Sequence, residues 1–163
     1  MIIVEEVDLF EVQRHELATE ANAKIGGYRM DLHCPMHEFR CYRAVLESSD
    51  LNRLFVMQDF ASLTVDNTCR LRDVMPIAGN LARVKSFTTS NIDLRLRDGL
   101  ELMLVGSELF GAPLTAIDGN HRMIAQYLTY YNVNGVSAYI CIHPAMSLWP
   151  YVPPLARTHT IQP

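Results

Sequence analysis

The residues best suited to chemistry lie in one short stretch, residues 118–122, which read Asp-Gly-Asn-His-Arg. An apolar run at residues 114–117 precedes them and is the right length for one buried strand. Asp118 and Gly119 end that run and permit a tight turn. Asn120 then predicts the N-cap of a helix, because its side chain can accept hydrogen bonds from the first turn.

Apolar side chains recur at helical spacing after this turn, at Met123, Ile124, Tyr127, Leu128 and Tyr131. His121 and Arg122 therefore fall in the first turn of the expected helix. Free N–H groups and the positive end of the helix dipole favour anions at this position. A strand, a glycine turn and a helix that starts with His and Arg together predict a phosphate or carboxylate site.

Residues 118–122, followed by Ala125, resemble the D/E-G-H/N-H/T-R motif of the ParB/sulfiredoxin superfamily. Residues 100–105 and 136–142 are similar to the family's strands before and after the motif helix. The resemblance covers about residues 93–149. It implies a single α+β domain with a small mixed sheet and flanking helices. It also implies nucleotide phosphate contacts from Gly119, Asn120, His121 and Arg122.

The resemblance further implies ATP or ADP as the cofactor, with CTP as another candidate, together with Mg²⁺. Arg122 is suited to bidentate phosphate binding, and His121 can donate a hydrogen bond or a proton. Asp118 can orient His121, assist Mg²⁺ or only close the turn. Asn120 stands where sulfiredoxins carry their catalytic cysteine, and an amide cannot replace that nucleophile. The free-serine kinases of the superfamily, with Asp-Gly-His-His-Arg, are nearer in motif.

Catalysis of phosphoryl transfer also calls for a carboxylate base, which these kinases place in a loop of the N-terminal half. Glu38 is the candidate here, with Asp31 and Asp66 as competitors. Glu108, after the strand that precedes the motif, is a further acid that can face the site. His33, Cys34 and His37 match no zinc spacing, so no metal site is predicted from them.

Composition indicates an ordinary globular chain, with 49% hydrophobic and 20% charged residues in a length of 163. The net charge of −4 and the pI near 5.8 argue against tight binding of double-stranded DNA. The N-terminus shows no signal-peptide pattern, and no apolar run is long enough to span a membrane. The cysteines lack C-x-x-C spacing, and Cys41 and Cys141 lie in strand-like runs as small apolar residues. A cytoplasmic protein with reduced thiols is expected.

Local patterns divide the chain into a domain at residues 1–150 and a proline-rich tail at residues 151–163. The expected helical segments are residues 4–25, 50–60, 68–87 and the motif helix. The expected strands are residues 2–4, 38–46, 63–65, 100–105, 114–117 and 136–142, and residues 86–97 read as a loop. Trp149 and Tyr151 are expected to hold the start of the tail to the domain.

The resemblance, taken together with the predicted anion site and the acidic pI, implies a nucleotide-dependent phosphotransferase or ATPase that acts on a small-molecule hydroxyl or carboxylate. The alternative is a ParB-like module that binds CTP or ATP, or a nuclease, without small-molecule turnover. No helix-turn-helix pattern follows the motif, which weighs against the DNA-segregation type. The expected partners are a nucleotide and a small substrate rather than a membrane or nucleic acid, and a homodimer stays among the options.

Overall fold

A six-stranded mixed sheet organises the computed structural model, which describes residues 1–8, 11–12, 39–90, 93–96, 101–148 and 152–156. The spatial order of the strands is β1-β2-β6-β4-β5-β3. Their bounds are β1 Ile2–Val7, β2 Arg40–Val45, β3 Leu54–Phe55, β4 Leu102–Gly106, β5 Leu114–Asp118 and β6 Ser137–Ile142. The β4–β6 and β3–β5 pairs are parallel, and the other neighbours are antiparallel.

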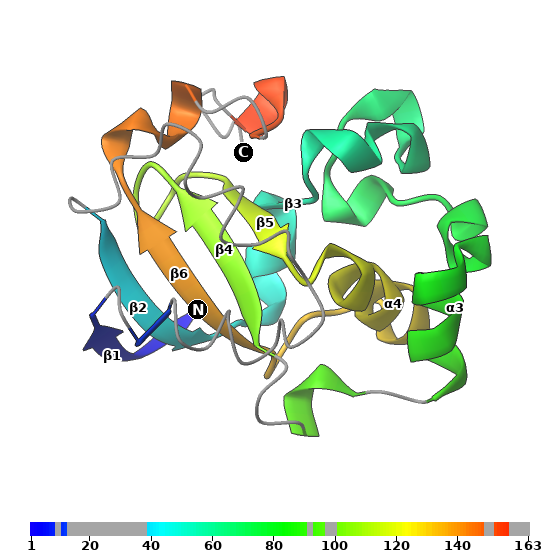
Figure 1. Ribbon diagram of the computed structural model, residues 1–163, viewed down its shortest axis with the longest axis horizontal. Coiled ribbons are helices and arrows are strands. Elements are labelled where there is room, and N and C mark those ends of the chain that lie inside the picture. The colour runs from blue at the N-terminus through cyan, green and yellow to red at the C-terminus, as the bar shows by residue number, and fades with distance from the viewer. Residues whose placement is uncertain (9–10, 13–38, 91–92, 97–100, 149–151, 157–163) are drawn as a thin grey trace.

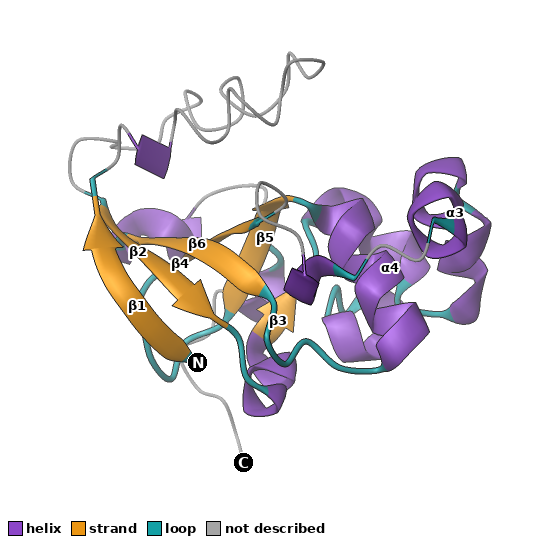
Figure 2. Ribbon diagram, turned by 90° about the horizontal axis from the view of Figure 1, so that it is seen from below, coloured by secondary structure: helices purple, strands orange, loops and turns teal. Residues whose placement is uncertain are grey.

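Two α-helices lie beside the β5–β3 end of the sheet, α3 at Ala82–Thr89 and α4 at Asn120–Tyr130 (Figure 1). They pack against each other, and Figure 2 shows both on the same side of the sheet. The chain between β3 and α3 is a series of 3₁₀ turns at Gln58–Leu63, Val65–Asn67, Leu71–Asp73 and Pro76–Asn80. Together these elements form one mixed α/β domain.

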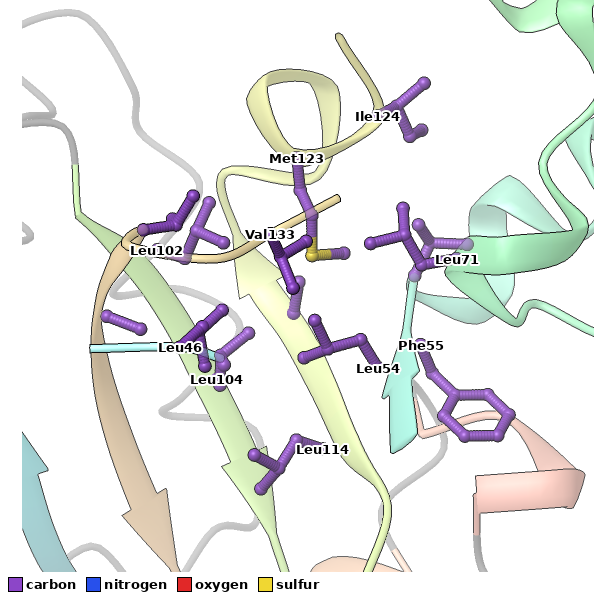
Figure 3. Close-up of a cluster of buried hydrophobic side chains, with 14 of the residues drawn as sticks. Leu46, Leu54, Phe55, Leu71, Leu102, Leu104, Leu114, Met123, Ile124 and Val133 are labelled. Carbon is purple, nitrogen blue, oxygen red and sulfur yellow. The ribbon is translucent and has the colours of Figure 1, made fainter. Parts of the chain in front are cut away.

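Hydrophobic side chains are buried on both faces of the central strands. Leu104 belongs to a cluster with Met123 of α4 and Leu71 of the 3₁₀ segment (Figure 3). The adjacent Met103 and Val105 belong to a second cluster on the opposite face, since successive side chains of a strand alternate between faces. Burial on both faces explains why β4 reads as an uninterrupted apolar run.

The start of the chain differs from the expected helix at residues 4–25, because Ile2–Val7 form edge strand β1. Acidic residues are typical of the first turn of a helix, but Glu5 and Glu6 instead face arginines on the neighbouring strand β2. Arg40 lies 3.3 Å from Glu6, and Arg43 lies 3.6 Å from Glu5. The same acidic residues therefore fit two structures, a strand with cross-strand ion pairs and the first turn of a helix. Of the rest of that predicted helix, residues 11 and 12 are helical, and residues 9–10 and 13–25 lie outside the described residues.

The segment from residue 50 to residue 87 is also less helical than expected. Residues 50–60 contain the end of a 3₁₀ turn, strand β3 and the start of another 3₁₀ turn, and residues 63–65 form no named strand. Backbone groups bond to distant partners here: Val56 N–H donates to Cys69 C=O at 2.8 Å, and Met75 N–H donates to Leu63 C=O at 2.8 Å. These long-range bonds replace the regular bonds of a helix. Helix α3 also continues to Thr89, into the expected loop.

Strands predicted at residues 38–46, 100–105, 114–117 and 136–142 are confirmed as β2, β4, β5 and β6, within a few residues at each end. The motif helix is confirmed as α4. Among the described residues, no helix has the length and apolar character needed to cross a membrane.

Candidate functional site

The junction between β5 and α4 is built around a glycine turn. Gly119 has φ 81°, in the left-handed region where a side chain is unfavourable. The Met123 N–H donates to the Gly119 carbonyl at 2.7 Å, so the helix starts within one residue of the predicted position. The N-cap itself is Gly119 rather than Asn120, and no side chain makes the capping hydrogen bond. This turn therefore leaves first-turn N–H groups without a side-chain cap.

Asn120 has a structural role that replaces its predicted capping role. The residue is 5% exposed. The Oδ1 atom accepts a hydrogen bond from Met57 N–H at 3.0 Å, and Nδ2 donates to the Ala116 carbonyl at 2.9 Å. The side chain thus joins β5 and the first turn of α4 to the segment that follows β3. Because both polar ends are engaged, a ligand contact from Asn120 would come from its backbone N–H.

Arg122 folds back toward the strand that precedes its helix. Its Nη2 donates to Asp118 Oδ2 at 2.6 Å and to the Glu101 carbonyl at 3.4 Å. Arg122 is 9% exposed, whereas the Asp118 side chain is 35% exposed. The ion pair closes the turn and balances the charge of both groups at the helix start. Only the remaining N–H groups of the guanidinium are then left for an anion.

His121 is half-buried between aromatic and charged neighbours. Its ring meets that of Phe60 edge-on, with centroids 5.1 Å apart. Burial lowers the pKa of His121 below its usual 6.5, the positive charge of Arg83 lowers it further, and Asp118 opposes both effects. The neutral imidazole is favoured as a result, and it can donate a hydrogen bond from one nitrogen and accept at the other.

This pKa shift predicts a pH dependence of stability. The folded state resists protonation of His121, so below about pH 6.5 the unfolded state binds more protons and the free energy of unfolding falls. When the pH is lowered from about 7.5 to 5, we expect the free energy of unfolding to fall less in His121→Asn than in the unaltered chain. Urea unfolding curves at several pH values measure the difference. Parallel pH profiles for the two chains would show that burial of His121 has no effect on stability.

Of the other candidate residues, Glu108 lies away from this junction, Asp66 is exposed, and the rest are outside the described residues. Glu38, Asp31, His33, Cys34 and His37 lie outside the described residues, as do Trp149 and Tyr151. Asp66 is an exposed residue of a 3₁₀ turn with φ 52°. Glu108 follows β4, which is antiparallel to β5 and pairs Met103 with Asp118. Glu108 therefore lies at the opposite end of these strands from the glycine turn.

Sequence patterns gave no indication of Met57, Phe60 or Arg83 as neighbours of the motif. The hydrogen bond between Met57 and Asn120 joins positions 63 residues apart. The closeness of Arg83 to His121 follows from the packing of α3 on α4. Within the described ranges, no group of three or more His, Cys, Asp or Glu side chains is arranged to hold a metal ion.

Comparison with protein-family models, curated proteins and solved structures gave no match. The similarity of residues 118–122 to the ParB/sulfiredoxin motif therefore rests on the residues themselves and on their strand–turn–helix setting.

Proposed function

We propose that the first turn of α4 binds the phosphate groups of a nucleotide, in a domain of the ParB/sulfiredoxin type. The observation that carries the proposal is the helix start, where no side chain caps the turn and where His121 and Arg122 are both present. Backbone N–H groups of Asn120, His121 and Arg122 are the proposed phosphate donors. The neutral imidazole adds a fourth donor, and Arg83 adds a nearby positive charge.

The proposed reaction is nucleotide-dependent phosphoryl transfer to a small-molecule hydroxyl or carboxylate, or hydrolysis of the nucleotide. Such a reaction depends mainly on positioning and on stabilisation of charge at the transferred group. His121 is suited to stabilise the negative charge that develops on a phosphate oxygen, because the hydrogen bond that it donates becomes stronger as that charge grows. Glu38 stays the proposed base that deprotonates the acceptor.

Mg²⁺ would reach this site together with the phosphates, as it commonly does in phosphoryl transfer. Asp118 is the carboxylate at the turn, and its exposed portion gives it the means to contact such an ion. The ion pair with Arg122 limits this role, since the carboxylate oxygen Oδ2 is already bonded at 2.6 Å. We therefore assign Asp118 first to holding Arg122 and the turn, and only second to the ion.

Calorimetric titration with ATP, ADP, CTP and GTP, with and without Mg²⁺, tests the proposal. His121→Ala is expected to weaken nucleotide binding about tenfold, because a hydrogen bond to a charged group contributes roughly 1.5 kcal/mol. His143→Ala is the matched control. His143 follows β6, next to Gly106, at the other end of the strands from α4. We expect the control to bind as the unaltered chain does.

An assay of nucleotide turnover and a titration with duplex DNA separate the alternatives. Nucleotide binding without turnover would favour a ParB-like module over the transferase, and salt-sensitive duplex binding would favour a nuclease. Failure of the unaltered chain to bind any of the four nucleotides would end the proposal. Equal losses in His121→Ala and His143→Ala would place the nucleotide elsewhere.

A further inference from the structure

Two cysteines stand directly opposite each other in the sheet. Cys41 of β2 and Cys141 of β6 are register partners in an antiparallel pair without a bulge. Both residues are 1% exposed and belong to the hydrophobic cluster on the face away from α4. Both residues are present as thiols. The fold therefore brings two thiols together from strands that are far apart in the sequence.

The pattern of hydrogen bonds between β2 and β6 determines how close these two residues are. Partners in an antiparallel pair alternate between hydrogen-bonded and non-hydrogen-bonded positions. Leu46 N–H donates to Val136 C=O at 2.9 Å, so this position is a hydrogen-bonded one. Cys41 lies five residues before Leu46. Because five is an odd number, the alternation makes Cys41 and Cys141 a non-hydrogen-bonded pair.

Strand β4, the other neighbour of β6, independently indicates that Cys41 and Cys141 are a non-hydrogen-bonded pair. His143 N–H donates to the Gly106 carbonyl of β4 at 3.0 Å. Cys141, two residues earlier on the same strand, directs its N–H toward the same side, which is away from β2. A residue whose N–H points away from its antiparallel partner occupies a non-hydrogen-bonded position.

Non-hydrogen-bonded partners bring their side chains closer together, with Cα atoms about 4.5 Å apart. Disulfides span Cα separations of roughly 4.4–6.8 Å, so the backbone already has a separation that a disulfide can bridge. Cys69 contrasts with this pair, because it belongs to the cluster on the other face of the sheet. Burial also raises the pKa of its thiol to about 11, which disfavours the reactive thiolate.

We propose that Cys41 and Cys141 form a site of reversible oxidation that cross-links β2 to β6. The oxidant is a low-molecular-weight disulfide. One cysteine, as a thiolate, attacks it to form a mixed disulfide and releases one thiol. The second cysteine then displaces the other thiol and completes the cross-link. Two protein thiols are oxidised, one disulfide is reduced to two thiols, and the two protons pass to the released thiols.

The surrounding side chains determine when this exchange occurs. Val12, Met146 and Val152 belong to the same buried cluster as the two cysteines. Exchange therefore requires local opening of this side of the sheet, and oxidation of the folded chain is slower than that of an exposed thiol. Once formed, the cross-link restrains the unfolded chain over a long loop and stabilises the native pairing of β2 with β6.

Incubation of the full chain with oxidised glutathione, in urea below the unfolding transition, tests the proposal. After alkylation and digestion without reductant, mass spectrometry is expected to find a peptide that joins Cys41 to Cys141. Treatment with dithiothreitol should remove it. The oxidised chain is expected to melt at a higher temperature than the reduced chain.

Two variants complete the design. Cys41→Ser is expected to abolish both the cross-linked peptide and the rise in melting temperature. The matched control Cys69→Ser, which removes a buried cysteine from the opposite face, is expected to retain both. Mixed disulfides with glutathione that never resolve, cross-links that use other cysteines, or no oxidation would each overturn the proposal. A lower melting temperature for the cross-linked chain would also overturn it.

Discussion

We expect Gly119→Ala to lower the free energy of unfolding by about 2–5 kcal/mol, from two separate causes. The first is the left-handed backbone at φ 81°, which costs a residue with a side chain about 1–2 kcal/mol. The second is contact: an added Cβ would lie 2.7 Å from Leu102 Cδ2 and 3.1 Å from Arg122 Nη2. Leu102 is fully buried, so its side chain has little room to move, and crowding of this kind costs roughly 1–3 kcal/mol.

Gly111→Ala is the matched control for this variant. Gly111 has φ 80°, and an added Cβ there meets nothing within 4 Å. Its expected loss is therefore the backbone cost alone, about 1–2 kcal/mol. Urea unfolding curves of both variants separate the backbone cost from the cost of contact. Equal losses at the two positions would contradict a tightly packed turn around Gly119.

The part of the site that sequence could predict is the part set by local patterns. The apolar run of β5, the Asp-Gly break and the helical spacing of α4 each involve residues close in the chain. Local preference and tertiary packing agree at this junction, so the helix start was predicted within one residue. The identity of the N-cap was wrong because the Asn120 side chain bonds to Met57 and Ala116 instead.

The segment around residues 50–60 shows why other elements were missed. Leu51, Leu54 and Phe55 match helical spacing, but in the structure a 3₁₀ turn followed by a short strand buries Leu54 and Phe55 and partly buries Leu51. The choice is made by distant partners: β3 pairs with β5, and Val56 N–H bonds to Cys69. The spacing of hydrophobic residues within a short segment carries no information about such distant partners.

Arg122 illustrates the same limit for chemistry. Sequence predicts that an arginine in the first turn of a helix is available to an anion. The structure shows a buried side chain that is bonded to Asp118 and to the Glu101 carbonyl. Substitution of Arg122 would thus disturb the fold and any phosphate contact together, which is why His121 is the better test of binding.

We expect Asn120→Ala to lower the free energy of unfolding by about 2–4 kcal/mol, because two buried hydrogen bonds are lost together. Met57 N–H loses its acceptor at 3.0 Å, and the Ala116 carbonyl loses its donor at 2.9 Å. Asn52→Ala is the matched control. Asn52 is exposed and accepts from Arg72 Nη1 at 3.2 Å, so its removal is expected to cost no more than about 0.5 kcal/mol.

Asn120→Asp tests the same arrangement with almost no change of shape. One carboxylate oxygen can still accept from Met57 N–H, but the other then faces the Ala116 carbonyl and cannot donate to it. A protonated carboxyl group can donate, so the fold raises the pKa of the new group. The folded state then binds more protons than the unfolded state, and stability is gained as the pH falls. Urea unfolding of Asn120→Asp at about pH 7 and pH 5 measures this gain. If Asn120→Asp is as stable as Asn52→Ala and its free energy of unfolding does not rise at lower pH, the Asn120 side chain does not hold this junction. The amide would then be available to a phosphate, as the motif alone predicts.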